Sequence, residues 1–172
     1  MSNKNSILDS QDLFPKYDII FIQETKISRP EILDFFTKIY KNYIVYHSYS
    51  LGNSGGLITM IKKNQNYKIT NAIITHKYIA IQISINKRNF NLVNIYCPNY
   101  PAERADLLKE IDYLFLNNGE TILGGDFNFV PNIKIDKKGG NAKKGDKGQA
   151  LMQILCDDFN LIDFWRFKNP NT

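Results

Sequence analysis

Thr121-Ile-Leu-Gly-Gly-Asp126 and Tyr17-Asp-Ile-Ile-Phe-Ile-Gln-Glu24 are two short apolar runs, and each ends at an acidic residue. A continuous apolar run of this length is typical of a strand that is covered on both faces. Strand ends are common places for catalytic groups in α/β proteins. The two runs therefore predict buried strands that carry a carboxylate at one end, within an α/β fold.

The chain between these two runs has mostly the pattern of β-strands. In Tyr78–Asn86, isoleucine at every second position alternates with smaller or polar residues, which is the period of a strand. The four residues from Asn86 to Asn89 predict a hairpin turn into this strand's partner. The other strands predicted here are Tyr43–Ser50, Gly56–Lys62, Tyr67–Thr75 and Asn89–Tyr96.

Helical patterns lie before, between and after the strands. Ser28 and Glu31 have the spacing of a capping box, and they predict a helix over Pro30–Tyr40. An apolar stripe from Leu107 to Phe115 predicts a second helix. Asp146-x-x-Gln149 predicts the start of a third, and Ser6–Phe14 has the pattern of the end of another. Together, the predicted strands and helices indicate an α/β sandwich in which helices cover mainly antiparallel sheets.

Length and composition exclude several classes of protein. The 172 residues predict one domain over 1–172, and a hydrophobic content of 43% excludes an intrinsically disordered chain. The sequence has no uninterrupted apolar run of about 18 residues, as a membrane span needs. Without a signal peptide we expect an intracellular protein, nuclear or cytoplasmic and not secreted. Cys97 and Cys156 make neither a disulfide framework nor a zinc motif.

The positive charge of the chain is concentrated in one loop. Residues 131–150 contain six lysines and two aspartates, so they carry +4 of the net charge of +5. Such a loop can bind nucleic-acid phosphates, or it can simply be a solvated charge run. The lysines that we expect to contact nucleic acid are Lys137, Lys138, Lys143 and Lys144.

Asp126 and Asn128 are two residues apart at the end of a predicted strand. In an extended chain this spacing points both side chains to the same side of the strand. Oxygen ligands of this kind suit Mg²⁺, which needs only one or two carboxylates. The same residues also fit an Asx turn before Pro131. Tyr96, at another strand end, can donate to a phosphate oxygen or be a half-buried aromatic side chain. We expect Trp165 to lie in the core.

Five blocks of the sequence occur in the order found in the endonuclease/exonuclease/phosphatase superfamily. The last, Leu161–Pro170, resembles the apurinic-type endonuclease domain of non-LTR (LINE-type) retrotransposons. The other four are Ile22-Gln-Glu-Thr-Lys26, Ser54-Gly-Gly56, Asn94-Ile-Tyr-Cys-Pro-Asn99 and Gly125-Asp-Phe-Asn128.

The resemblance implies a four-layer αββα sandwich of the DNase I type that cleaves a DNA phosphodiester with Mg²⁺ or Mn²⁺. Carried over residue by residue, it implies that Glu24 holds the metal and that Asp126 activates the attacking water. It likewise implies that Asn128 contacts the scissile phosphate and that Tyr96 stabilises the charge of the transition state. A reverse transcriptase domain is the implied partner in a longer product.

The sequence also departs from this family. Nothing before Tyr17 resembles the first strand of the family, which carries a metal-binding Asn, and no Asp-His dipeptide occurs in the chain. We therefore expect an incomplete domain that lacks the first strand and the C-terminal strands and that cleaves DNA weakly or not at all. Two alternatives stay open: a non-catalytic remnant or DNA-binding module, and a phosphatase or lipid phosphodiesterase of the same superfamily.

Overall fold

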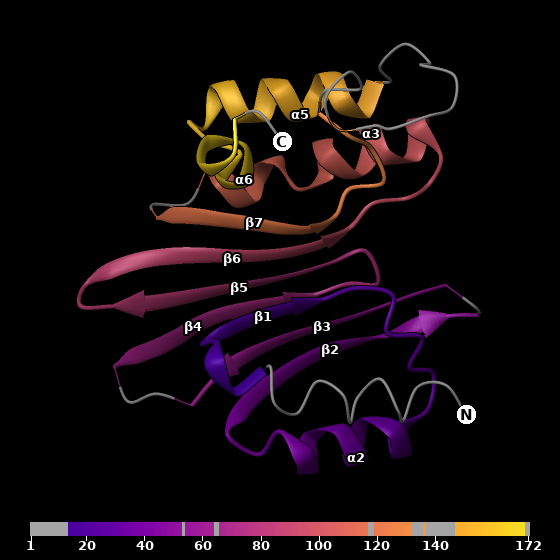
Figure 1. Ribbon diagram of the computed structural model, residues 1–172, viewed down its shortest axis with the longest axis vertical. Coiled ribbons are helices and arrows are strands. Elements are labelled where there is room, and N and C mark those ends of the chain that lie inside the picture. The colour runs from indigo at the N-terminus through magenta and orange to yellow at the C-terminus, as the bar shows by residue number, and fades with distance from the viewer. Residues whose placement is uncertain are drawn as a thin grey trace. The chain divides into compact units, whose positions relative to one another are not determined.

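The computed structural model describes residues 14–52, 54–63, 66–116, 119–131, 136 and 147–170 (Figure 1). The chain forms two compact units. The first comprises Met1–Tyr96 and Ile122–Asp126, and the second comprises Cys97–Thr121 and Phe127–Thr172. The strands are β1 (Ile19–Ile22), β2 (Tyr43–Leu51), β3 (Ser54–Lys62), β4 (Tyr67–Ile74), β5 (Tyr78–Ile85), β6 (Arg88–Tyr96) and β7 (Glu120–Asp126). The helices are η1 (Phe14–Lys16), α2 (Pro30–Ile39), α3 (Pro101–Glu110), η2 (Asp112–Phe115), α5 (Lys147–Asp158) and α6 (Phe164–Lys168).

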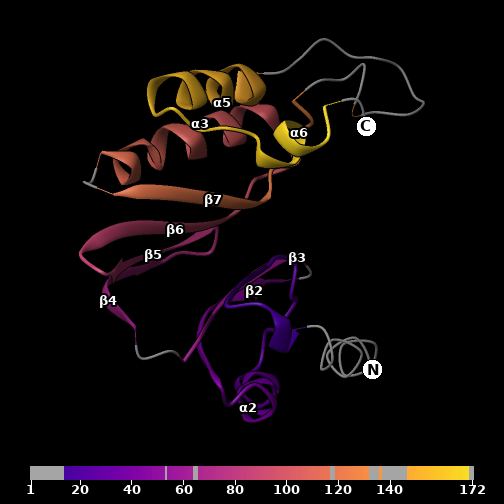
Figure 2. The ribbon, with the colours of Figure 1, turned by 60° about the vertical axis from the view of Figure 1, so that its left-hand side comes forward.

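The first sheet has the order β1-β3-β2, with both neighbours antiparallel to β3. Helix α2 packs on one face of this sheet (Figure 2). Alternate side chains of β3 point toward that helix, because successive residues of a strand face opposite sides. The cluster that joins helix and sheet consists of Ile27, Leu33, Phe36, Tyr40, Tyr43, Ile58 and Met60, all buried.

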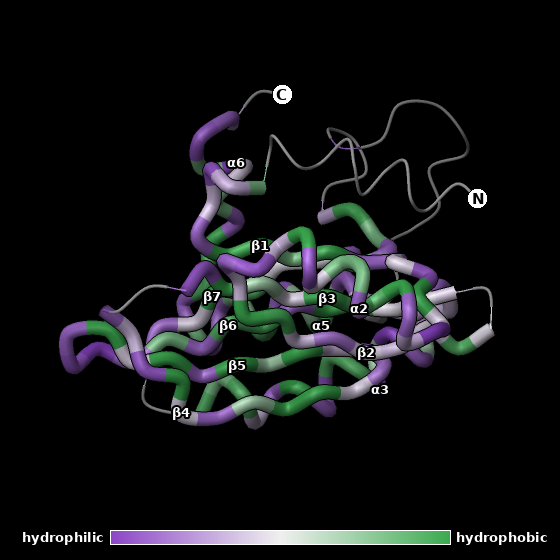
Figure 3. Tube along the Cα trace, turned by 90° about the horizontal axis from the view of Figure 1, so that it is seen from below, coloured by the Kyte–Doolittle hydropathy of each residue, from purple (hydrophilic) through white to green (hydrophobic). Residues whose placement is uncertain are grey.

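The second sheet has the order β4-β5-β6-β7, and its first three strands pair antiparallel. Asn86 and Lys87 make the β5–β6 turn, both with positive φ (50° and 67°), as a two-residue hairpin with strand-compatible twist requires. A second cluster fills the space between the two sheets, and β5 contributes an apolar stretch to it (Figure 3). Its buried members are Leu57, Ile61, Ile79, Ile81, Ile83 and Leu92. The sheets are therefore mainly antiparallel, as the pattern of strands and helices in the sequence predicted.

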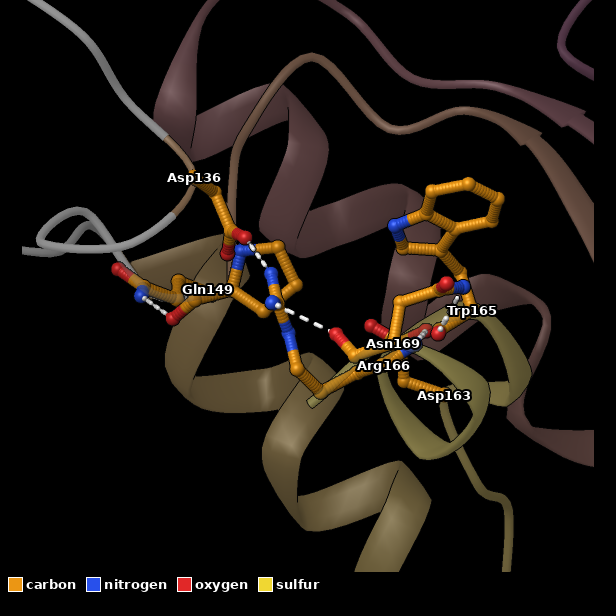
Figure 4. A network of polar contacts seen from close by, with 7 residues as sticks. Asp136, Gln149, Asp163, Trp165, Arg166 and Asn169 are labelled. Carbon is orange, nitrogen blue, oxygen red and sulfur yellow. Dashed lines mark hydrogen bonds and ion pairs between the residues drawn. The ribbon is translucent and has the colours of Figure 1, made fainter. Parts of the chain in front are cut away.

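The helices of the second unit pack through apolar side chains. Leu107 and Leu108 of α3 are buried, and so is Leu155 of α5. The rings of Phe115 and Phe159 stack with their centroids 5.1 Å apart. The side chain of Asp163 accepts a hydrogen bond from the Arg166 amide and caps α6 (Figure 4).

One predicted helix start differs from the structure. The residue that caps α2 is Arg29, and no side chain donates to or accepts from the helix end there, so the capping box of Ser28 and Glu31 is wrong. Proline at the first position of α2 begins the helix without it, because its fixed φ suits that position. The helix predicted to start at Asp146-x-x-Gln149 is present as α5 (Lys147–Asp158). The side chain of Gln149 donates to the carbonyl of Pro131 (Figure 4). Asp146 lies outside the described residues.

The prediction of Trp165 as a core residue is wrong. Within the described residues its exposed fraction is 67%, and those of Phe164 and Phe167 are 63% and 70%. The error has a physical reason: α6 has five residues, too few for the helical period to indicate which side of the helix is covered. Cys97, in contrast, is fully buried, as expected for a small apolar side chain.

None of the helices in the described part of the chain combines the length and the apolar character that a membrane span requires.

Candidate active site

Three of the predicted site residues converge in the first unit. Tyr96 is the last residue of β6, Asp126 is the last of β7, and Glu24 follows two residues after β1. The Tyr96 hydroxyl donates a hydrogen bond of 2.5 Å to Glu24 Oε1. The negative charges of Glu24 and Asp126 both act on Tyr96. The structure thus brings residues that are up to 102 positions apart in the sequence (126 minus 24) into one polar cluster.

A glycine lets β7 lie against β6 at this cluster. Gly125 has a φ of 148°, and a Cβ atom added there would overlap the backbone of Ile95. Any other residue would push the two strands apart, and Asp126 would then move away from Tyr96. Glycine at position 125 therefore permits the close backbone approach of the two strands.

The loop that carries Glu24 is bent and held by β3. Glu24 and Lys26 have φ of 52° and 53°, which is uncommon for residues other than glycine. The amides of Thr25 and Lys26 donate to the carbonyls of Gly56 and Gly55, each at 3.1 Å. These bonds compensate for a backbone conformation that would otherwise be unfavourable.

The electrostatic environment keeps the Tyr96 hydroxyl protonated. The hydrogen bond to Glu24, then burial and the negative charges of Glu24 and Asp126 raise the pKa of Tyr96 to about 12. Tyr96 is therefore a hydrogen-bond donor at neutral pH. Lys26 Nζ lies 3.6 Å from Glu24 Oε2, with both side chains substantially exposed, so this ion pair contributes little to stability.

Asn128 belongs to the second unit, two residues after Asp126 in the chain. Its φ is 52°, and its side-chain Nδ2 donates to the carbonyl of Cys97 at 2.6 Å. The amide of Asn128 is thus oriented by the segment that follows β6. This contact is not an Asx turn, in which a side-chain oxygen accepts from the backbone, so the Asx turn stays a prediction. A turn and a catalytic role would be compatible, because loops commonly hold functional side chains.

Arg104 orients the same segment, and sequence reasoning missed it. Its side chain is 3% exposed, and Nη1 donates to the carbonyls of Asn128 (2.8 Å), Pro98 (2.9 Å) and Asn99 (3.3 Å). A signal was present, since Arg104 lies three and four residues before Leu107 and Leu108, on the buried stripe of α3. A charged residue on an apolar stripe indicates a buried partner.

The lysines of the basic loop lie outside the described residues: Lys137, Lys138, Lys143 and Lys144. Asp136, from the same loop, is described, and it forms an ion pair with Arg166 of α6 (Figure 4). Arg166 also donates to the carbonyl of Asn169.

The oxygen donors of the first unit suit a hard cation. Glu24 and Asp126 offer carboxylates beside a Tyr hydroxyl, and one or two carboxylates are enough for Mg²⁺, which keeps several waters. No group of three or more His, Cys, Asp or Glu side chains that could enclose a metal occurs among the described residues. The chemistry of the donors fits an open, largely hydrated cation, and it does not fit a closed structural site.

A family model described as Endonuclease/Exonuclease/phosphatase family matches residues 2–166. A curated relative is the "Transposon TX1 uncharacterized 149 kDa protein" of Xenopus laevis, which is 26% identical over 167 residues. The matched region covers 91% of this chain and 12% of that protein, so the chain spans about one eighth of the relative's length.

Solved structures show the same fold. An AP endonuclease from Archaeoglobus fulgidus has a TM-score of 0.74 at 16% identity, covering 99% of this chain and 70% of that one. TDP2 from D. rerio, solved with a single-strand DNA product, has a TM-score of 0.56 at 18% identity, covering 78% of this chain and 56% of that one. These likenesses confirm the predicted α/β fold of DNase I type, two sheets with flanking helices.

Proposed function

The chain belongs to the endonuclease/exonuclease/phosphatase family, and from that membership we propose that it is the DNA-cleaving, Mg²⁺-dependent endonuclease region of a retrotransposon protein. The observation that carries this proposal is the convergence of Glu24, Tyr96 and Asp126 at the ends of strands from two sheets. Two carboxylates beside a neutral hydroxyl donor can supply a metal ligand, a general base and a donor to developing negative charge, which are useful for hydrolysis of a phosphodiester.

The resemblance to the family gives each residue a role, and the chemistry of each side chain suits that role. Asp126 accepts the proton of the attacking water and orients that water toward phosphorus. Tyr96, protonated at neutral pH, donates to the non-bridging oxygen on which negative charge develops. Asn128, whose amide is already oriented by Cys97 and by the loop that Arg104 holds, contacts the scissile phosphate.

Glu24 would hold the metal, with Mn²⁺ as an alternative to Mg²⁺. A cation bound to this carboxylate supplies Lewis acidity to the phosphate. Glu24 is suited to this role because its carboxylate is 42% exposed, and its present ion pair with Lys26 is weak and easily exchanged.

The test is nicking of supercoiled plasmid by residues 1–172 in excess over DNA, with Mg²⁺ and with EDTA. We expect slow nicking that needs the divalent cation and is lost in Asp126→Ala. The rate should be low because the sequence contains no Asp-His dipeptide, the pair that this family uses to stabilise charge. The matched control is Asp106→Ala, which removes an exposed acid from α3 and should nick like the parent chain.

Equal nicking by the parent chain and Asp126→Ala would contradict the proposal. Salt-sensitive DNA binding with no nicking at all, unchanged by Glu24→Ala, would instead indicate a DNA-binding module without catalysis. Hydrolysis of a phosphate monoester or of a phospholipid in place of DNA would indicate a phosphatase or a lipid phosphodiesterase.

A further inference from the structure

A fully buried amide lies between the two sheets, close to the Glu24–Tyr96 pair. Asn94, on β6, has no exposed surface. Its Oδ1 accepts a hydrogen bond of 2.6 Å from Gln23 Nε2. Its Nδ2 donates to the carbonyl of Ile58 at 2.9 Å and to Thr59 Oγ1 at 3.2 Å, with a longer contact of 3.4 Å to the carbonyl of Ile22.

The positions of these partners relate the amide to the candidate site. Gln23 immediately precedes Glu24, and Asn94 precedes Tyr96 by two residues, so both β6 side chains point to the same side of the strand. Thr59 is the register partner of Phe21 on β1. A single side chain thus connects the end of β1, the middle of β3 and the strand that carries Tyr96.

Stability alone does not explain an amide at this position. The buried hydrophobic members of the cluster between the sheets are aliphatic side chains of β3, β5 and β6. A buried amide is tolerated only when its donors and acceptor are satisfied, and an apolar residue of the same shape can be equally stable or more so. What the amide adds is geometry, because its hydrogen bonds form at only one relative position of the strands.

That geometry matters because Glu24 and Tyr96 come from different sheets. The hydrogen bond of 2.5 Å between them requires the end of β1 and the end of β6 to stay in place. Beyond Glu24, the Gly55 and Gly56 carbonyls hold the loop through the amides of Lys26 and Thr25. Before Glu24, the side chain of Gln23 is anchored by Asn94.

We propose that Asn94 and Gln23 are positioning residues, which fix the Glu24 carboxylate against the Tyr96 hydroxyl by joining the two sheets directly beside them. Neither residue touches the reacting groups. The inference rests on the proposed function only in that the positioned pair serves metal binding and catalysis.

The test compares Asn94→Leu with Asn91→Leu in the full 172-residue chain. Asn91 lies on the same strand, is 6% exposed, accepts from Gln82 Nε2 at 3.3 Å and points to the opposite face, so it is a matched buried amide. We expect Asn94→Leu to stay folded but to exchange the Thr25 and Lys26 amide hydrogens at least about tenfold faster. Its affinity for Mn²⁺, measured by calorimetry, should fall by about 10- to 100-fold. Asn91→Leu should change neither quantity.

Gln23→Met is the second variant, because Gln23 is only partly buried and its loss leaves the core between the sheets intact. It should reproduce the faster exchange of Thr25 and Lys26. The proposal is overturned if folded Asn94→Leu or Gln23→Met keeps the parent exchange rates and Mn²⁺ affinity. Hydrogen exchange needs neither metal nor DNA, so this outcome is distinct from a failure of nicking in the parent chain.

Discussion

At the residue scale, the site depends on polar side chains that are placed by other polar side chains. Tyr96 is held by Glu24, Gln23 by Asn94 and Asn128 by Cys97 and Arg104. In each case the orienting partner is a backbone carbonyl or a side chain from a different element of the fold. Substitution of an orienting residue should therefore affect function through geometry and not through loss of a reacting group.

Arg104→Met tests, in the second unit, whether an orienting residue affects function through geometry. The guanidinium donates to three carbonyls, and hydrogen bonds from charged donors contribute about 1.5–3 kcal/mol each, of which burial of the charge offsets a large part. We expect the free energy of unfolding to fall by about 2–3 kcal/mol, measured by urea denaturation. Nicking should fall more than DNA affinity does, because Asn128 loses its orientation.

Lys109→Met is the control for Arg104→Met, since it removes an exposed cation from the same helix and should leave both quantities unchanged. Arg104→Lys keeps the charge but not the planar fork of donors. If Arg104→Lys and Arg104→Met both nicked DNA at the parent rate, an orienting role for Arg104 would be wrong.

At the scale of elements, strand ends and the loops that follow them build the site. Two glycines in these regions let neighbouring backbone segments lie close together. Gly125 of β7 lies against the backbone of β6, and Gly56 of β3 lies against the Glu24 loop. The conformation of the Glu24 loop therefore depends on β3, an element of the same sheet that contributes no side chain to the Glu24–Tyr96–Asp126 cluster.

Gly55 and Gly56 offer a direct comparison. Their φ values are 81° and 83°, so alanine at either position has the same unfavourable backbone conformation, at a cost of about 1 kcal/mol. A Cβ atom at Gly55 meets nothing within 4 Å, whereas one at Gly56 overlaps the Thr25 hydroxyl and presses on Lys26. We expect Gly56→Ala to lose additional stability and to weaken Mn²⁺ binding, as measured by thermal unfolding and calorimetry.

Gly55→Ala supplies the control, because it carries the backbone cost without the overlap. Equal Mn²⁺ affinity in the two variants would mean that the position of the Glu24 loop does not depend on its contact with β3.

At the scale of the whole molecule, charge is distributed unevenly. The net charge is +5, and the segment 131–150 accounts for +4 of it. If this segment binds the DNA backbone, the logarithm of the binding constant should fall with the logarithm of salt concentration by about 0.9 for each phosphate neutralised.

Replacing Lys137, Lys138, Lys143 and Lys144 together by glutamine should reduce that salt slope by as much as about 3.6, measured by fluorescence anisotropy across a salt series. The control replaces four exposed lysines of the first unit, Lys16, Lys38, Lys41 and Lys68, and so makes the same change in net charge. Identical slopes for the two quadruple variants would show that binding responds to net charge alone and that the loop is a solvated charge run.

Local patterns were sufficient for the fold class and for placing Glu24, Tyr96 and Asp126 at or near strand ends. The alternation of isoleucines in β5 and the apolar runs that end near Glu24 and at Asp126 predicted strands, because strand periodicity and burial are properties of neighbouring residues. Motif order then indicated the family. Patterns failed at the start of α2, where proline begins the helix without a capping side chain. They failed also at Trp165, because a helix of five residues is too short for its period to indicate the covered side.

The sequence by itself determined the elements, the family and the chemical identity of Glu24, Tyr96, Asp126 and Asn128. Only the tertiary structure decided which of these residues meet, and through which contacts. The hydrogen bond from Tyr96 to Glu24 spans 72 residues, and the one from Gln23 to Asn94 spans 71. Neither pair can be recognised from a periodic pattern in the sequence. Hydrogen bonds between sheets depend on how the strands pair and stack, and not on the spacing of residues along the chain.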